Sequence, residues 1–183
     1  MKEHRVSFRY AKALLDSAKK EGVTEIISKD FESIKMTFLM SKELRHFAAS
    51  PVVQLWRKRK ILNEIFLEEN INKLTLEFLI LLIDKRRGDL ILSIIDEFEK
   101  QYNILNKRLP IIVEASVELD DKIKNQIIKK VAEKAKMTIL PEYRLNKELK
   151  GGILVRIDDW VFDASIKNQL KILKRQLIEG NSN

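Results

Sequence analysis

The longest apolar pattern in the chain runs from Leu74 to Ile83, and it sets the expected organisation of the whole sequence. On a helical wheel of about 100° per residue, the polar residues Lys73, Glu77 and Asp84 share one narrow stripe, and apolar side chains fill most of the remainder. A surface helix is usually apolar over only about a third of its circumference. We therefore expect the central helix of a helical bundle here, because a membrane span needs about 20 residues.

The segment 5–21 predicts a second helix with more apolar surface than one neighbour covers. An arc of roughly 100° holds Arg9, Lys12, Asp16, Lys19 and Lys20, and apolar and small residues occupy roughly 220° of the remainder. Half of that wide arc consists of small residues, namely Ala11, Ala13, Ser17 and Ala18, which allow another helix to approach closely. Gly22 is placed to end this helix.

Four further helices are predicted before residue 105. They cover 24–40, 42–48 after a Ser41 cap, a segment that follows Ser50-Pro51 and ends near Phe66, and a segment that opens at Gly88-Asp89. In the third of these four, a helical periodicity is supplied by Val53, Trp56, Lys60, Ile61, Ile65 and Phe66. Six helices joined by short polar turns predict a compact bundle over residues 1–105.

The pattern changes near residue 106 and predicts a small α+β domain over 106–183. Its expected elements are a strand at 110–117 with Pro110 at its first position, a helix at 122–135 and a strand at 137–145. Pro141 inside the second strand implies a sheet edge or a bulge. A β-hairpin with Asp158-Asp159 as its turn and a last helix follow. The expected fold is therefore mainly α: an N-terminal six-helix bundle followed by a small α+β domain with a β-hairpin.

Composition agrees with this picture. Apolar residues make up 45% and charged residues 34% of the 183 positions, a profile typical of soluble proteins. Only 5 Gly and 3 Pro are present, which favours helices, and the absence of Cys excludes disulfides and thiolate metal sites. The first residues, Met1–Arg5, precede no apolar run, so we expect neither a signal peptide nor a membrane span.

The formal charge of +8 raises the question of nucleic-acid binding. The excess is spread over both halves of the chain, and the only dense basic run is Arg57–Lys60, whose four side chains would point in different directions on a helix. No recognisable motif accompanies it. A mild basic surplus indicates solubility and non-specific association, so we expect no sequence-specific nucleic-acid binding.

No group of residues predicts catalysis or a metal site. His4 and His46 lack the spacing of metal ligands, and Asp158, Asp159 and Asp163 fall at a turn and a helix start, where Asp serves the backbone. The pair Gly151-Gly152 is suited to a tight turn and forms no phosphate-binding loop. Phosphate binding by Lys58–Lys60 and Arg86-Arg87 is a weaker interpretation than solvated helix ends. We expect no catalytic, cofactor or metal residues and no enzyme.

Three stretches together resemble one family. Arg9-Tyr10-Ala11-Lys12-Ala13-Leu14 is similar to the family's opening R-Y-A-x-A-L. The second stretch runs from Ser50-Pro51 through Lys60-Ile61-Leu62 to Arg86-Arg87 and Phe98, and the third from Gly151 to Ser165 is similar to G-G-x-x-x-x-x-G-D-x-x-x-D-G-S. The family is the delta subunit of F-type ATP synthases, equivalent to the mitochondrial oligomycin-sensitivity-conferring protein. Asp158 and Ala164 stand where that pattern usually has Gly, and these positions would carry no chemistry.

The resemblance implies a non-catalytic stator subunit, present in one copy per complex. Residues 1–105 are implied to bind the N-terminal segment of the alpha subunit on the catalytic head, and residues 106–183 the C-terminus of the peripheral-stalk b subunits. The subunit would lie on the cytoplasmic face of the bacterial inner membrane without inserting into it, and would resist rotor torque so that proton flow drives ATP synthesis. The alternative is a helical adaptor or a basic nucleic-acid-associated protein, whose binding would weaken steeply with added salt.

The resemblance and the apolar pattern meet at one hypothesis. Two adjacent helices with surplus apolar surface form a groove for a third, partner helix. We expect this groove to be lined by Tyr10, Ala13, Leu14, Ser17, Leu74, Phe78 and Leu81.

On the last helix, Ile166, Leu170, Leu173 and Leu177 either cover the small sheet or meet the stalk helices, and both alternatives stay open. The nearby Lys171, Lys174 and Arg175 would contribute to the rim of such a contact.

Overall fold

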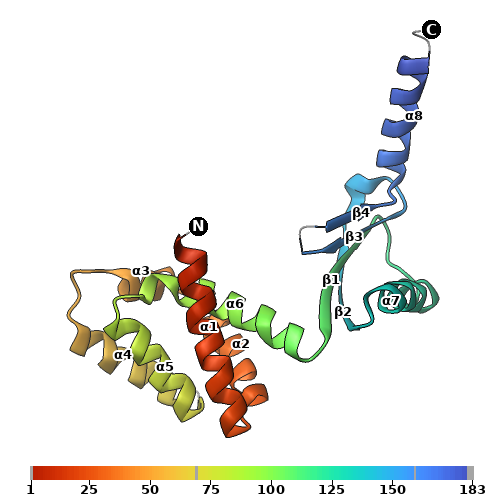
Figure 1. Ribbon diagram of the computed structural model, residues 1–183. Coiled ribbons are helices and arrows are strands. Elements are labelled where there is room, and N and C mark those ends of the chain that lie inside the picture. Colours follow the sequence, from red (N-terminus) through yellow and green to blue (C-terminus); the bar gives the residue numbers. More distant parts are fainter. Residues whose placement is uncertain (1, 69, 159, 181–183) are drawn as a thin grey trace. The chain divides into compact units, whose positions relative to one another are not determined.

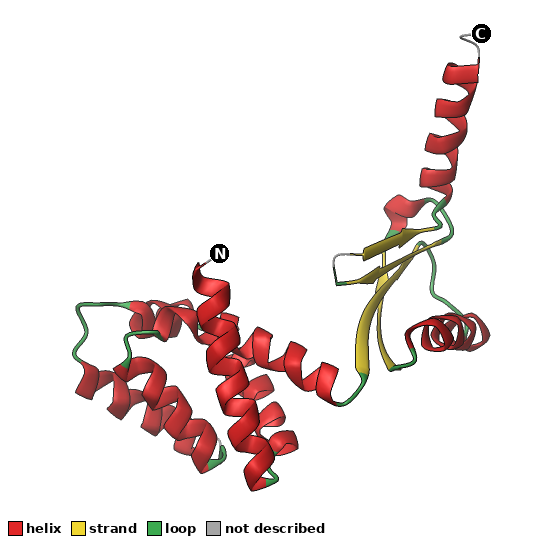
Figure 2. Ribbon diagram, in the orientation of Figure 1, coloured by secondary structure: helices red, strands yellow, loops and turns green. Residues whose placement is uncertain are grey.

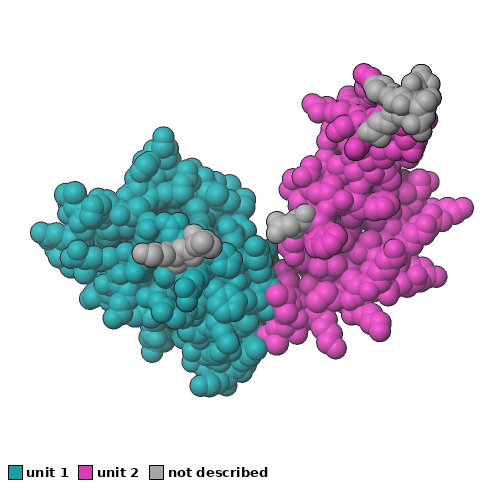
Figure 3. Space-filling view, turned by 45° about the horizontal axis from the view of Figure 1, so that its top comes forward, with its two compact units in different colours: residues 1–102 teal, residues 103–183 magenta. Residues whose placement is uncertain are grey.

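The computed structural model describes residues 2–68, 70–158 and 160–180, which divide into two compact units, Met1–Tyr102 and Asn103–Asn183 (Figure 3). The first unit is helical, and the second combines two α-helices with a four-stranded sheet (Figure 2). A mainly α fold with a small α+β region at its C-terminal end is therefore confirmed.

Unit 1 contains one α-helix for each predicted helical segment (Figure 1). Their bounds are α1 (Lys2–Glu21), α2 (Thr24–Met40), α3 (Lys42–Ala49), α4 (Leu55–Glu68), α5 (Lys73–Asp84) and α6 (Ile91–Leu105), with a short 3-10 turn, η1 (Gly88–Leu90), before α6. Helix α6 ends a few residues beyond the division between the units.

Local side-chain chemistry sets several of these helix ends. Ser41 Oγ accepts a hydrogen bond from the Leu44 amide at 3.0 Å, which confirms the predicted cap of α3. Asn72 Oδ1 likewise accepts from the Leu74 amide at 2.9 Å and caps α5. Gly22 follows α1 with φ of +71°, a left-handed conformation that glycine adopts without steric cost.

The core of unit 1 is built on aromatic rings from several helices. Phe31 of α2 contacts Phe98 of α6 edge-on with ring centroids 4.9 Å apart, and also approaches Phe78 of α5 at 6.2 Å. Phe38 of α2 stacks on Phe66 of α4 at 6.3 Å. Helix α2 therefore joins α4, α5 and α6 through geometries that aromatic pairs prefer.

Thr75 interrupts the apolar side of α5, away from the polar stripe of Lys73, Glu77 and Asp84, and it is fully buried. Its hydroxyl donates to Asp30 Oδ2 of α2 at 2.6 Å, and the Asn72 amide donates to the same oxygen at 2.9 Å. The interruption in the sequence pattern is thus a satisfied polar link between α2 and the start of α5, as buried polar groups require.

The residues whose periodicity predicted α4 do not all lie on its buried side. Trp56 is 62% exposed and Lys60 is exposed, whereas Leu62, Phe66 and Lys58 are buried. Lys58 is only 6% exposed and is no solvated helix end: its Nζ donates to the carbonyl oxygens of Ala48 and Ser50, both at 2.6 Å. The Lys58 ammonium bonds carbonyls at the C-terminal end of α3 and therefore turns the Lys58 side of α4 inward. Hydrophobic periodicity alone does not show this orientation.

We expect Lys58→Met to lower the free energy of unfolding of unit 1 by about 1–3 kcal/mol, because one buried and one partly buried carbonyl lose their donor. Burial also lowers the pKa of the Lys58 ammonium, as does the nearby Arg86 charge. Urea unfolding followed by the NMR signals of the buried Phe66 checks this. The matched control is Lys60→Met, because Lys60 is exposed and faces Glu64 at 3.8 Å, one turn along the same helix. Equal loss of stability in the two variants would contradict a specific role for Lys58.

Unit 2 has the sheet order β2-β1-β3-β4. Its elements are β1 (Arg108–Ala115), α7 (Asp121–Ala135), β2 (Thr138–Leu145), a 3-10 turn η2 (Lys147–Leu149), β3 (Ile153–Ile157), β4 (Trp160–Asp163) and α8 (Ile166–Gly180). Strands β1 and β2 are parallel and joined by α7, whereas β3 runs antiparallel to both β1 and β4. Asp120 Oδ1 caps α7 by accepting from the Ile123 amide at 2.7 Å.

The predicted places of two prolines and one aspartate in the strands can be compared with the structure. Strand β1 begins at Arg108, so Pro110 is its third residue and the predicted first position is wrong; β3 pairs only with Ile112–Ala115, leaving Pro110 beside β2 alone. Pro141 lies in β2 at the edge of the sheet, as predicted. Asp158 in the hairpin turn has φ of +48°, and Asp159 lies outside the described residues.

The core of unit 2 is small and lies between α7 and one face of the sheet. It consists of Ile111, Val113, Ile127, Ile139 and Val155, with half-buried apolar side chains around them. Helix α7 packs against β2, at the opposite edge of the sheet from β4. The β4 edge is therefore the part of this face that α7 covers least.

Candidate partner-binding surfaces

The seven side chains expected to line a groove on α1 and α5 divide into a buried set and a set that keeps exposed area. Leu14 and Phe78 are 3% and 7% exposed and belong to the core of unit 1, so neither offers free surface to a partner. The other five residues keep exposed area: Ala13 and Leu81 are exposed, and Tyr10, Ser17 and Leu74 are half-buried. We call these five residues the α1–α5 surface.

The residues of the α1–α5 surface form one stripe along each of the two helices. Tyr10, Ala13 and Ser17 recur at three- and four-residue steps on α1, and Leu74 and Leu81 are seven residues apart on α5, so each set follows one stripe. The Tyr10 and Phe78 rings meet edge-on with centroids 6.5 Å apart and bring the two stripes together. Small residues on one helix and leucines on the other are suited to receiving an apolar helix face.

Helix α8 carries the second candidate surface. Ile166, Leu170, Leu173 and Leu177 share one side of the helix and are 44%, 54%, 51% and 63% exposed. Leu170, Leu173 and Leu177 are therefore not covered by the sheet, whereas Ile166 at the start of the helix lies against Gly151. The exposure of the three leucines favours the partner-facing alternative for them. Lys171, Lys174 and Arg175 of the same helix are exposed as well. A helix with a continuous uncovered apolar stripe is suited to packing against helices of a partner.

Hydrogen bonds fix the first turn of α8, although the leucines of its apolar side are exposed. Asp163 Oδ1 accepts from the Ser165 amide at 2.9 Å, and Ser165 Oγ accepts from the Asn168 amide at 3.1 Å. The hydrogen bonds to Ser165 lower the pKa of the Asp163 carboxyl. A Cβ at Gly152, whose φ is +77°, would lie 2.3 Å from the Ala164 carbonyl oxygen, so only glycine fits there. Asp163 thus serves the backbone, as predicted.

Strand β4 adds apolar surface for which the sequence predicted no role. Trp160 is 82% exposed, and Val161 and Phe162 are also exposed. Phe162 pairs with Val155 and Trp160 with Ile157, so both aromatic side chains extend the core face of the sheet beyond α7. The sequence contained a signal for this surface, because three large apolar residues follow one another in the hairpin. Side chains alternate between the two faces of a strand, so such a run places apolar side chains on both faces, including a face that no helix covers.

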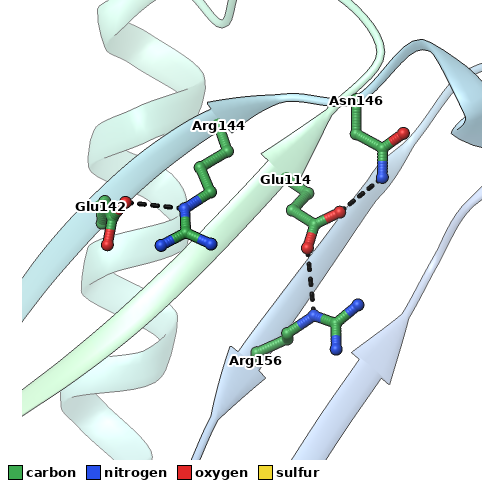
Figure 4. Close-up of polar contacts among 5 residues, drawn as sticks. All are labelled: Glu114, Glu142, Arg144, Asn146 and Arg156. Atoms are coloured by element: carbon green, nitrogen blue, oxygen red, sulfur yellow. Dashed lines mark hydrogen bonds and ion pairs between the residues drawn. The ribbon is translucent and has the colours of Figure 1, made fainter. Parts of the chain in front are cut away.

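The other face of the sheet is polar at its centre (Figure 4). Glu114 of β1 is only 12% exposed at its side chain; its Oε2 accepts from Asn146 Nδ2 at 2.6 Å and its Oε1 from Arg156 Nε at 3.0 Å. The hydrogen bond from Asn146, and then the Arg156 guanidinium, lower the pKa of the Glu114 carboxyl. Beside it, Arg144 Nε donates to Glu142 at 2.7 Å. These contacts tie β1 to β3 and to the residue after β2.

We expect unit 2 to lose stability in acid through Glu114. Its pKa is below the ordinary value of 4.5 in the folded state, so the unfolded state binds more protons, and stability is lost as the pH falls from about 4.5 through the folded pKa. Glu114→Gln should flatten this dependence, measured as urea unfolding of unit 2 against pH through the NMR signals of Val113 and Val155. Glu148→Gln is the control, because Glu148 is 84% exposed and lies 3.9 Å from Lys167. An unchanged acid dependence in Glu114→Gln would count against this role.

Metal ligation and membrane insertion can be judged for residues 2–68, 70–158 and 160–180. No group of three or more His, Cys, Asp or Glu side chains in this part of the chain could hold a metal ion. Within the same residues, no helix combines the length and the apolar character needed to cross a membrane.

Comparison with known proteins gives a consistent result. The model of a family described as "ATP synthase delta (OSCP) subunit" matches residues 6–177. The chain is 32% identical over 181 residues to ATP synthase subunit delta of Halalkalibacterium halodurans, covering 98% of each chain. It is 33% identical over 177 residues to the same subunit of Carboxydothermus hydrogenoformans, covering 97% of this chain and 99% of the relative.

A solved structure resembles the fold as well. One chain of the Toxoplasma gondii mitochondrial ATP synthase hexamer, determined by cryo-electron microscopy, matches with a TM-score of 0.74 at 23% identity. The match covers 94% of this chain and 97% of that one. At this identity the likeness concerns the fold, and it extends over both units.

Proposed function

The chain belongs to the ATP synthase delta (OSCP) subunit family, and from this premise we propose how its two units divide the work of a stator. The family membership makes it a structural, non-catalytic component of the peripheral stalk of ATP synthase, in preference to a helical adaptor or a nucleic-acid-associated protein. The proposal concerns its contacts: unit 1 binds the catalytic head, and unit 2 binds the stalk.

On the head side, the occupant of the α1–α5 surface is an amphipathic helix from the N-terminal segment of the alpha subunit. The observation that carries this proposal is the exposure of Leu81 and Ala13 beside the half-buried Tyr10, Ser17 and Leu74, above a floor of Leu14 and Phe78. A docked apolar helix face removes this area from water, and burial of each large apolar side chain favours binding by about 1.5–3 kcal/mol.

On the stalk side, the apolar face of α8 binds the C-terminal helices of the b subunits. The exposed residues Leu170, Leu173 and Leu177 supply the apolar contact, and Lys171 and Lys174 form a basic rim for acidic stalk ends. With one copy per complex, unit 1 holds the head and unit 2 holds the stalk on the cytoplasmic face of the bacterial inner membrane. The head is thereby kept from turning with the rotor, so that proton flow is coupled to ATP synthesis.

Reconstitution tests the division of roles. Membranes containing ATP synthase stripped of this subunit should regain ATP-driven proton pumping when the purified full chain is added. Catalytic heads that lack the alpha N-terminal segment should no longer retain the chain during gel filtration, although it still binds the b subunits. Retention by the truncated heads with unchanged affinity would contradict the assignment of the head contact.

A further inference from the structure

A pocket of about 530 Å³ lies in unit 1, between the first turns of α1 and the segment that follows α5. Three arginines contribute to its lining, Arg5 and Arg9 from α1 and Arg87 from the turn before η1. The remaining lining residues are Glu3, Val6, Asp89 and Leu90. None of the seven residues expected to line the groove on α1 and α5 lines this pocket.

The three guanidinium groups are available to a ligand. Within the part of the chain that the structure describes, no carboxylate lies within 4.0 Å of Arg5, Arg9 or Arg87, although Glu3 and Asp89 line the same pocket. The negative charge of Asp89 is shared with the buried Lys58, whose pKa it raises against the effect of burial. Three arginines against two acids leave the lining positive, and α1 begins there with the positive end of its dipole.

The pocket continues the α1–α5 surface. Val6 lines the pocket and lies four residues before Tyr10, which is one turn of α1, or about 6 Å. On the other side, Arg87 follows Leu81 by six residues, just after the end of α5. The apolar surface therefore ends at a basic pocket, and a helix that covers Ala13 and Leu81 passes within about two turns of the arginines.

We propose that this pocket receives an acidic side chain of the same amphipathic helix that occupies the α1–α5 surface, one to two turns beyond its apolar stripe. The inference rests on the docking proposed above and adds its register. Guanidinium groups bind carboxylates through paired hydrogen bonds of fixed geometry, so the contact fixes where the helix stops along the surface and in which direction it runs. Apolar contacts alone allow a helix to slide by a turn.

The test uses the full chain and a synthetic alpha N-terminal segment of the same source, with affinity measured by calorimetry. Arg9→Gln with Arg87→Gln should weaken binding about tenfold, because charge-assisted hydrogen bonds are lost. Replacing the peptide's acidic residue next to its apolar stripe by the matching amide should weaken binding to the unaltered chain by a similar factor, and should have little further effect on the double variant. The control is Lys12→Gln with Lys19→Gln, which removes the same charge from exposed positions of α1.

The outcomes separate this inference from the docking itself. Coupled losses in the chain and the peptide, with the lysine control unchanged, support the pocket. Equal weakening by the arginine and lysine pairs, or a peptide amide that binds as well as the acid, overturns it while the docking stands. An alpha segment without any acidic residue within two turns of its apolar stripe also overturns it. Failure of the unaltered chain to bind the peptide at all overturns the docking and this inference together.

Discussion

Ala13→Arg should leave unit 1 folded and weaken binding of the alpha N-terminal segment by about 30-fold or more, the effect of disrupting a central contact of an interface. Ala13 is exposed at the middle of the α1–α5 surface, so a long charged side chain disturbs none of the buried core. It occupies the space of the incoming helix and places an unpaired charge against its apolar face. Calorimetric titration with the peptide measures the loss, and circular dichroism verifies the fold.

Lys12→Arg is the matched control for Ala13→Arg. Lys12 is exposed on α1 immediately before Ala13 but lies outside the α1–α5 surface. Its affinity for the peptide should equal that of the unaltered chain. If Ala13→Arg also binds the peptide normally, the apolar stripe on α1 has no part in the head contact, and the assignment of these residues is wrong.

Leu170→Asp with Leu173→Asp should abolish the contact with the b subunits. Both leucines are more than half exposed on α8, so the fold of unit 2 does not depend on them. In the proposed complex they become buried against stalk helices, and two lost leucine contacts correspond to about 3–6 kcal/mol, or at least a hundredfold in affinity. A titration of the full chain with the purified C-terminal region of the b subunits measures the change.

The control for α8 is Gln169→Asp with Gln176→Asp, which adds the same charge at exposed positions beside the apolar stripe. This variant should keep most of its affinity for the b subunits and should bind the head normally. Similar losses in the leucine and glutamine variants would indicate that charge on α8, and not its apolar face, governs the contact.

Local chemistry explains why most elements were predictable from the sequence. Ser41 and Asp120 cap helices through amides three residues ahead, so the signal and its effect lie within one turn of chain. Asp158 adopts the left-handed conformation in the hairpin turn, which Asp accepts more readily than most other residues apart from glycine. Pro141 marks an edge strand because it lacks an amide hydrogen.

The misinterpretations share a different cause, since each depends on residues distant in sequence or on relative exposure. Lys58 is buried because the carbonyls of Ala48 and Ser50 satisfy it, and hydrophobic periodicity cannot weigh such partners. Leu14 and Phe78 lie beneath the α1–α5 surface because they pack in the core of unit 1. A helical wheel shows the direction of a side chain but not how deeply it is buried. The pocket of Arg5, Arg9 and Arg87 joins positions about eighty residues apart, which only the fold brings together.

An apolar surface on α1 and α5, covered in the complex by a helix of the alpha subunit, is central to the proposed stator role. Amide hydrogen exchange of the full chain, with and without the alpha N-terminal segment, tests this most directly. We predict that the segment slows exchange in 10–17 and 74–81 and leaves α8 unchanged. Slowed exchange confined to unit 2, or unchanged exchange throughout α1 and α5 while the peptide is bound, would contradict it.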